Sequence, residues 1–290
     1  MIDSPLPSVS AWVRALADAE IPVLPHAMVE LQQLREIEET RGTVDARTLA
    51  DTMGANPLMV LKVIAHVSRY CTRLGVEPPE TLTGAIVMMG ISPFFNTFLN
   101  APTFIEWFKS DPEAQSGLLK VITRARRAAN FSLNFAIRRQ DEDAGILYEA
   151  ALLHDFAEML LWCHAPKLAK EIDHLKQADP TLRSAAAQKA VLGTTLNTLA
   201  HELMREWQLP DMLIKCTDER RANDPQVRNV MLAVRLARHS RNGWDAPNAQ
   251  AAARSEMDNL AWQVRNFAEL SARAPDDKVR LREAADAAKR

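Results

Sequence analysis

Residues 152–161 read Leu-Leu-His-Asp-Phe-Ala-Glu-Met-Leu-Leu, and this stretch decides how the rest of the chain is interpreted. His154 and Asp155 stand side by side inside an apolar run that is compatible with a helix. Burying two such groups is unfavourable unless they are hydrogen-bonded, paired or bound to a metal. We therefore expect one helix over about residues 144–163, with the pair serving either as half of a metal site or as a polar node in the core.

The composition is that of an ordinary globular protein. The 290 residues are 47% hydrophobic and 25% charged, and the formal net charge is -2. This balance gives no electrostatic reason to expect nucleic acid or an anionic membrane as a partner. The apolar runs are shorter than the roughly 20 residues that span a bilayer, and the N-terminus does not resemble a signal peptide. Three scattered cysteines without a CxxC pair favour a reducing compartment, so we expect a cytoplasmic protein.

The residue types favour helices throughout. Only 9 glycines and 6% aromatic residues are present, and no stretch shows a convincing alternation of β-branched residues, so we expect an all-α fold. Asn56-Pro57, Ser92-Pro93 and Asp111-Pro112 each combine a capping residue with proline, the typical start of a helix. A long helix is expected from the last of these to Arg139.

Further helix signals lie at both ends of the chain. We expect Thr43 to cap a helix that Gly54 ends in the left-handed conformation. Two terminal helices are expected over 248–271 and 276–289. The tryptophans lie in helical apolar patterns and are interpreted as core anchors, and Cys216 is interpreted as a buried structural thiol.

Four segments, taken in order, resemble the HDOD family, a divergent branch of the HD phosphohydrolase superfamily found in bacterial signalling proteins. They are Ile21–Pro25, the helix–turn–helix of residues 49–63, Thr83–Gly90, and Ala151–Leu161 together with Trp207-Gln208-Leu209-Pro210. The resemblance implies an all-α domain over residues 18–220, with helical lobes at about 20–110 and 111–220. A C-terminal helical extension, residues 221–290, is expected to pack on it.

The positions of the HD metal ligands depart from the superfamily pattern. The resemblance implies that the metal ligands are an upstream His, the His-Asp pair and a later Asp, often with further His residues. The upstream His would fall in 121–127, which holds arginines; Leu196, Cys216-Thr217 and Val234 stand at the other positions. Arg, Leu and Val do not donate a lone pair to a metal at neutral pH. We therefore expect a vestigial pair, His154 and Asp155, with no catalytic, metal or cofactor site.

The arginines in this segment form the second candidate site. Arg124, Arg126 and Arg127 could contact a phosphate or a nucleotide second messenger, because the guanidinium suits bidentate phosphate binding. A solvated or salt-bridged face is favoured instead, since the helix is followed by the acidic residues 141–143.

The resemblance implies a non-catalytic signalling or regulatory protein that binds a protein partner. Two alternatives stay open. One is a metal-dependent phosphohydrolase of nucleotides or cyclic dinucleotides, and the other is a sensor that binds a nucleotide second messenger through the arginines. The sequence identifies neither the partner nor the oligomeric state.

Overall fold

The structure is a computed structural model that describes residues 1–179, 181–221 and 223–240. Within these ranges the fold is all-α, as the composition predicts, with one isolated parallel β-bridge between Val23 and Thr103. No helix in the described part of the chain is long and apolar enough to cross a membrane. The helices expected over 248–271 and 276–289 lie outside the described residues, as does most of the predicted C-terminal extension.

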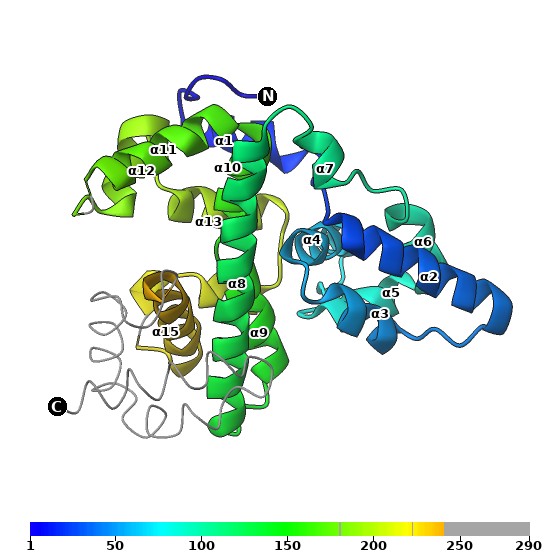
Figure 1. The fold of residues 1–290 in the computed structure, drawn as a ribbon. Helices are drawn as coiled ribbons and strands as arrows, with labels where there is room; N and C mark the ends of the chain where they lie inside the picture. Colours follow the sequence, from blue (N-terminus) through cyan, green and yellow to red (C-terminus); the bar gives the residue numbers. More distant parts are fainter. Residues whose placement is uncertain (180, 222, 241–290) are drawn as a thin grey trace. The chain divides into compact units, whose positions relative to one another are not determined.

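The helices follow one another through short turns (Figure 1). In chain order they are α1 (Val9–Ala17), α2 (Pro25–Arg41), α3 (Ala46–Met53), α4 (Pro57–Leu74), α5 (Leu82–Met89), α6 (Ile91–Phe98), α7 (Phe104–Trp107), α8 (Pro112–Arg138), α9 (Ala144–Leu153), α10 (Phe156–His164), α11 (Pro166–Ala178), α12 (Ser184–Leu192), α13 (Leu196–Glu206), α14 (Asp211–Cys216), the 3-10 helix η1 (Glu219–Arg221) and α15 (Pro225–His239).

The chain divides into two compact units. Unit 1 comprises residues 1–122 and 155–214, and unit 2 comprises residues 123–154 and the chain from 215 onward. The long helix α8, predicted from the sequence, contributes its first part to unit 1 and the rest to unit 2. The lobes expected at about 20–110 and 111–220 stay a prediction.

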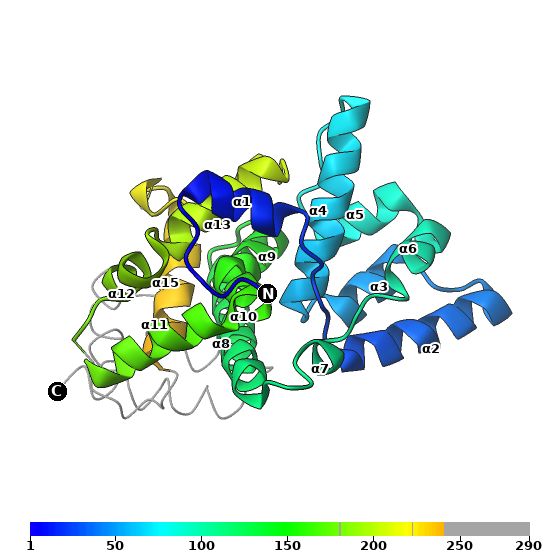
Figure 2. The same cartoon turned by 90° about the horizontal axis from the view of Figure 1, so that it is seen from above.

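Helices α2 to α6 form one group in unit 1 (Figures 1 and 2). Within this group, α4 begins and ends at the residues that the sequence signals indicate. Asn56 caps α4 by accepting from the Met59 N–H at 3.3 Å, and proline occupies the first position of the helix. Gly75 ends α4 with φ of 68°, a left-handed conformation that glycine adopts without strain. The apolar side of α4, which includes Leu58 and Leu61, is fully buried.

A second group in unit 1 combines α1 with α10 to α13. Two buried tryptophans join distant parts of the chain in this group: the indole N–H of Trp12 donates to the carbonyl of Leu192 at 3.3 Å. The indole N–H of Trp207 donates to the carbonyl of Ala17 at 2.9 Å. A buried tryptophan ordinarily needs such a partner, so these anchors fix α1 against α12 and α13.

Helix α10 also packs closely on the first part of α8. Gly117 of α8 faces the ring of Trp162, and a Cβ at this position would lie 2.5 Å from the ring. Trp162 is buried. Trp107 is only partly buried, and its indole N–H donates to the carbonyl of Cys163 at 2.7 Å. The four described tryptophans, Trp12, Trp107, Trp162 and Trp207, therefore act as core anchors, with Trp107 at the margin.

Three predicted helix ends differ in detail. Asp45, not Thr43, caps α3, because its carboxylate accepts from the Thr48 N–H at 2.7 Å. Gly54 ends α3 in a right-handed conformation, with φ of -64°. Helix α6 begins before the expected Ser92-Pro93, with Gly90 at its N-cap position.

Candidate functional site

The His-Asp pair lies between two helices. The single helix predicted over 144–163 is wrong, since α9 ends and α10 begins on either side of the pair. His154 keeps a helical backbone, whereas Asp155, with φ of -99° and ψ of 19°, occupies the N-cap position of α10. The Asp155 carbonyl accepts from the Glu158 and Met159 N–H groups at 3.1 and 3.2 Å. His154 therefore lies at the end of α9, and Asp155 lies just before the start of α10.

Both members of the pair are buried. His154 is 9% exposed and Asp155 is 7% exposed. The Asp155 carboxylate does not cap α10, although capping is the usual role of an aspartate at this position. The boundary between the units falls between the two residues, with His154 in unit 2 and Asp155 in unit 1. Their burial fits the polar node expected from the sequence, and the partners of the two side chains stay a prediction.

The core of unit 2 contains a polar node that the sequence analysis missed. The Ser132 hydroxyl on α8 donates to the Leu147 carbonyl on α9 at 2.9 Å. The side-chain amide of Asn229 on α15 donates to the Ser132 carbonyl at 3.0 Å and to its hydroxyl at 2.9 Å. Asn229 is almost fully buried, and its Oδ1 atom has no hydrogen-bond partner among the described residues. Three helices of unit 2 therefore meet at one hydrogen-bonded group.

The residues at the other HD ligand positions are all buried. Val234 lies on α15 and Cys216 ends α14, both in unit 2, and Leu196 begins α13 in unit 1. Burial raises the pKa of Cys216 to about 12, so its sulfur is a neutral thiol at neutral pH. A metal needs the thiolate. None of these three side chains can therefore supply a ligand at neutral pH in the conformation shown.

The predicted arginine site consists of half-buried side chains. Arg124, Arg126 and Arg127 lie on the part of α8 that follows Ile122. The guanidinium of Arg127 donates to the carbonyl and hydroxyl oxygens of Ser240, at 3.1 Å each, just after the end of α15. A positive charge at this end of a helix is favourable because the last carbonyls carry partial negative charge. Phosphate binding by this side chain would compete with these contacts.

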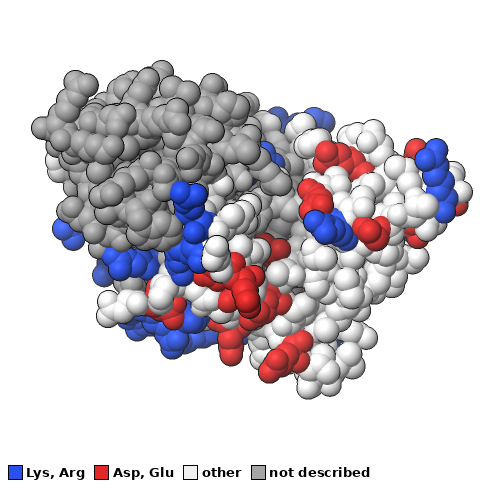
Figure 3. Space-filling view, turned by 90° about the horizontal axis from the view of Figure 1, so that it is seen from below, with Lys and Arg blue, Asp and Glu red and all other residues white. Residues whose placement is uncertain are grey.

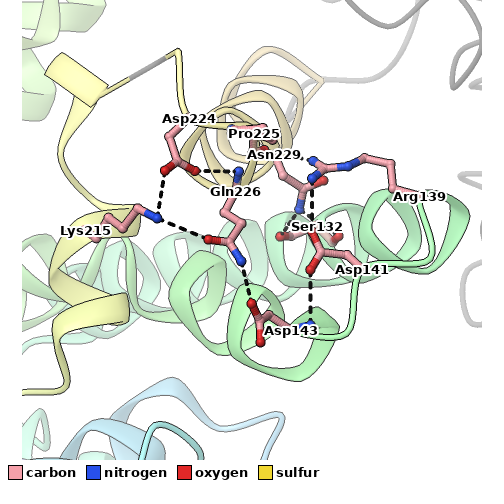
Figure 4. Close-up of polar contacts among 9 residues, drawn as sticks. All are labelled: Ser132, Arg139, Asp141, Asp143, Lys215, Asp224, Pro225, Gln226 and Asn229. Carbon is pink, nitrogen blue, oxygen red and sulfur yellow. Dashed lines mark hydrogen bonds and ion pairs between the residues drawn. The ribbon is translucent and has the colours of Figure 1, made fainter.

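A polar network surrounds the start of α15 (Figure 4). Lys215 makes an ion pair with Asp224 at 2.7 Å and donates to the Gln226 side chain at 3.2 Å. Asp224 also accepts from the Gln226 backbone N–H at 2.9 Å, and the Gln226 amide donates to Asp143. The hydrogen bond from Lys215, opposed by partial burial, holds the pKa of Asp224 below its usual range. The network therefore stabilises the Asp224 carboxylate in its charged form.

Arg139 connects the same network to the end of α8. Its guanidinium donates to the Pro225 carbonyl at 2.8 Å and to the Asp141 carboxylate at 3.0 Å. Asp141 in turn accepts from the Asp143 N–H at 3.1 Å. The sequence shows a polar loop at 140–143 and a helix start at Asp224, but no local pattern links them, because Asp143 and Gln226 are 83 positions apart.

Across the described ranges, no three or more His, Cys, Asp or Glu side chains gather in a way that could hold a metal ion. A different kind of feature lies on unit 1, where a hollow of about 420 Å³ is lined by residues of α2 and of α6 and the turn that follows it. Phe95 and Leu99 supply its apolar lining, and Arg35, Glu36 and Glu39 supply charges. The Arg35 guanidinium lies over the Phe95 ring, 5.5 Å from its centre. Gln32, Asn96 and Asn100 complete the lining, so most of the side chains around this hollow are polar or charged.

Comparison with known proteins agrees with the resemblance seen in the sequence. A family model of the HDOD domain matches residues 21–222. The chain belongs to the HDOD family. No curated protein sequence matches the chain.

Two solved structures are similar over nearly their whole lengths. The MmoQ response regulator from Methylococcus capsulatus str. Bath is 18% identical, with a TM-score of 0.61 over 90% of this chain and 97% of that chain. A virulence factor from Campylobacter jejuni subsp. jejuni is 18% identical, with a TM-score of 0.69 over 94% of this chain and 99% of that chain. At this level of identity the likeness establishes the shared fold.

Proposed function

We propose that this chain is a non-catalytic regulatory protein of bacterial signal transduction, which works in the cytoplasm by binding a protein partner. Membership of the HDOD family supports this proposal. So does the description of one similar structure as a response regulator. The HD scaffold is then retained as a binding platform, while its metal chemistry is lost.

The observation that carries the proposal is the chemistry of the side chains at the HD ligand positions. Leu196 and Val234 have no lone pair to donate, and Cys216 is a buried neutral thiol. His154 and Asp155 then stand without the other ligands of an HD site. Two protein ligands fall short of the three or four that hold a catalytic transition metal.

Metal content and hydrolase activity test the loss of catalysis. The purified full chain is incubated with Mn²⁺, Fe²⁺ or Zn²⁺, desalted and analysed for bound metal, and then assayed with nucleotides and cyclic dinucleotides. We expect less than stoichiometric metal and no turnover above that of the His154→Ala variant. One metal per chain that disappears in His154→Ala, with turnover that disappears with it, would identify a phosphohydrolase and overturn the proposal.

The hollow between α2 and α6 is the surface that we propose for the partner. Most of its lining is polar or charged, which suits a partner segment that presents polar and charged side chains to it. Glu36 and Glu39 outnumber Arg35 among its charged residues, so a partner segment with basic side chains fits best.

Charge reversal tests this surface. The full chain is used as bait in an extract of its host, beside the double variant Glu36→Lys/Glu39→Lys and the control Glu206→Lys, which changes an exposed charge on α13. We expect a protein that is retained by the native chain and by the control and released by the double variant. Equal retention by all three baits would exclude this hollow as the partner site.

The sensor alternative is tested separately. Cyclic dinucleotides are screened for a thermal shift with the native chain and with Arg126→Ala. We expect no shift, because the Arg127 guanidinium beside Arg126 already donates to Ser240. A shift that is lost in Arg126→Ala would favour nucleotide sensing over partner binding.

A further inference from the structure

Exposed apolar side chains gather on the hairpin formed by α4 and α5. Among the described residues, large exposed hydrophobic side chains are scattered singly elsewhere, but five fall within this hairpin: Tyr70, Leu74, Val76, Val87 and Met88. Leu74 is 59% exposed and Val87 is 67% exposed. In Figure 3, the part of the surface formed by α2 to α6, on the right, is more uncharged than charged. A clustered apolar patch is typical of an interaction site.

Three of these residues, Tyr70, Leu74 and Val76, lie at the end of α4 and in the loop that follows it. Tyr70 and Leu74 are one turn apart on α4 and share a face. The Val76 N–H donates to the Cys71 carbonyl at 3.1 Å, which folds the chain back over the last turn of α4. The sulfur of Met88 on α5 lies 3.0 Å from the sulfur of Cys71. Figure 2 shows that this end of α4 extends beyond the neighbouring helices of its group, so it is accessible.

Charges of both signs at this end are open to a partner. Arg73 lies in the last turn of α4, and Glu77 and Glu80 follow in the loop. Within the part of the chain that the structure describes, none of these three makes an ion pair, whereas Arg69, one turn earlier, pairs with Asp18 at 3.4 Å. An anionic membrane is disfavoured, because the two glutamates outnumber the free arginine.

We propose that this end of the α4–α5 hairpin is a two-fold symmetric interface between two copies of the chain. A two-fold interface requires a self-complementary surface, in which residue i of one copy meets residue j of the other and the reverse. With the axis close to Gly75, Leu74 faces Val76 of the second copy and Arg73 faces Glu77. The apolar residues supply the buried area, and the unpaired charges fix the orientation of the two copies.

The oligomeric state of the full chain tests the proposal. We expect analytical ultracentrifugation to give the mass of two chains, with dissociation on dilution. Leu74→Glu places an unpaired charge in the centre of the interface, so we expect its dissociation constant to rise roughly tenfold or more. The control Val29→Glu changes an exposed apolar residue of α2 and leaves the mass unchanged. A native chain that is monomeric at all concentrations, or a dimer that Leu74→Glu does not weaken, would overturn the proposal.

Charge exchange tests the orientation. Arg73→Glu alone brings like charges together across the axis and weakens the dimer. Arg73→Glu combined with Glu77→Arg restores opposite charges and brings the dissociation constant back toward the native value. Failure of the double variant to recover would exclude this pairing. Thermal unfolding of each variant at a concentration where it is monomeric confirms that the exposed changes leave the fold intact.

Discussion

Substitution of Gly117 by alanine measures how tightly α8 packs on α10. The new Cβ would lie 2.5–2.6 Å from three atoms of the Trp162 ring, about 1 Å inside the normal contact distance of about 3.5 Å between carbon atoms. The ring is buried, so the contact cannot be relieved by moving it into solvent.

The magnitude follows from two opposing effects. Forcing an extra methyl group into a packed core costs about 1–3 kcal/mol, and this contact belongs at the upper end. Alanine in place of glycine within a helix contributes about 1 kcal/mol in the other direction. We therefore expect Gly117→Ala to lower the free energy of unfolding by about 2 kcal/mol, or the melting temperature by roughly 4–8 °C.

Urea unfolding followed by circular dichroism measures the effect, with Gly145→Ala as the matched control. Gly145 lies in α9 and has open space where its Cβ would be, so alanine there should stabilise by about 0.5–1 kcal/mol. In a Trp162→Phe background the smaller ring leaves room, and Gly117→Ala should cost less than about 0.5 kcal/mol. Stabilisation by Gly117→Ala equal to that of the control would refute the close packing.

Three further predictions concern buried or paired polar groups and the cysteines. Asn229→Ala should lower the free energy of unfolding by about 2–3 kcal/mol, because it removes two hydrogen bonds to Ser132 and leaves a cavity. Urea unfolding measures this change, and a loss below about 0.5 kcal/mol would contradict the prediction. The lowered pKa of Asp224 means that its ion pair with Lys215 stabilises the fold above about pH 4 and that this contribution is lost as the pH falls through the folded-state value. Asp224→Asn should therefore destabilise at pH 7, and its difference from the native chain should shrink toward pH 3; a difference that is constant with pH would argue against the pair. The three buried cysteines, with the pKa of Cys216 raised to about 12, should react with a thiol reagent only at the rate of unfolding, and fast labelling of the folded chain would contradict their burial.

The helices were largely predictable because their starts and stops are local. The pairing of Asn56 with Pro57 and the glycine at 75 each act within one turn, and the structure places helix ends there. Thr43 was predicted wrongly as the cap because Asp45 offered a better capping group two residues later. The left-handed conformation predicted for Gly54 was also wrong, since its φ is -64°. The all-α class followed from the composition and from patterns of this kind, whereas the family was recognised from the resemblance of four segments.

The break at the His-Asp pair shows where the sequence signal was ambiguous. The apolar run from Leu152 to Leu161 continues through the pair, so periodicity alone predicts an unbroken helix. A capping signal was present nonetheless, because Asp155 is followed three residues later by Glu158, the spacing of a capping box. The structure begins α10 at this point without the side-chain capping bond.

The polar groups of unit 2 could not be predicted, because they depend on contacts between segments far apart in the chain. Asn229 lies 97 positions from Ser132, and it is the one polar residue among the buried residues of α15. Such a residue indicates that a partner is needed but does not say which residue provides it. The residues at the HD ligand positions, in contrast, were assigned through the resemblance to the family, and the loss of the metal site stays a prediction.

The hydrogen bonds among Ser132, Leu147 and Asn229 also bear on how the core of unit 2 keeps a single alignment. Apolar contacts between helices tolerate a slide along the helix axis, because one branched side chain fills a gap much as another does. A slide of α15 by one turn would carry Asn229 away from Ser132 and leave the buried Asn229 amide without these two acceptors, at a cost of about 1–3 kcal/mol. These hydrogen bonds thus fix the register of α15 against α8, in the way that a single buried asparagine fixes the register of the helices in a coiled coil. Replacing both residues with apolar ones should leave a core of similar stability whose helices no longer settle on one alignment.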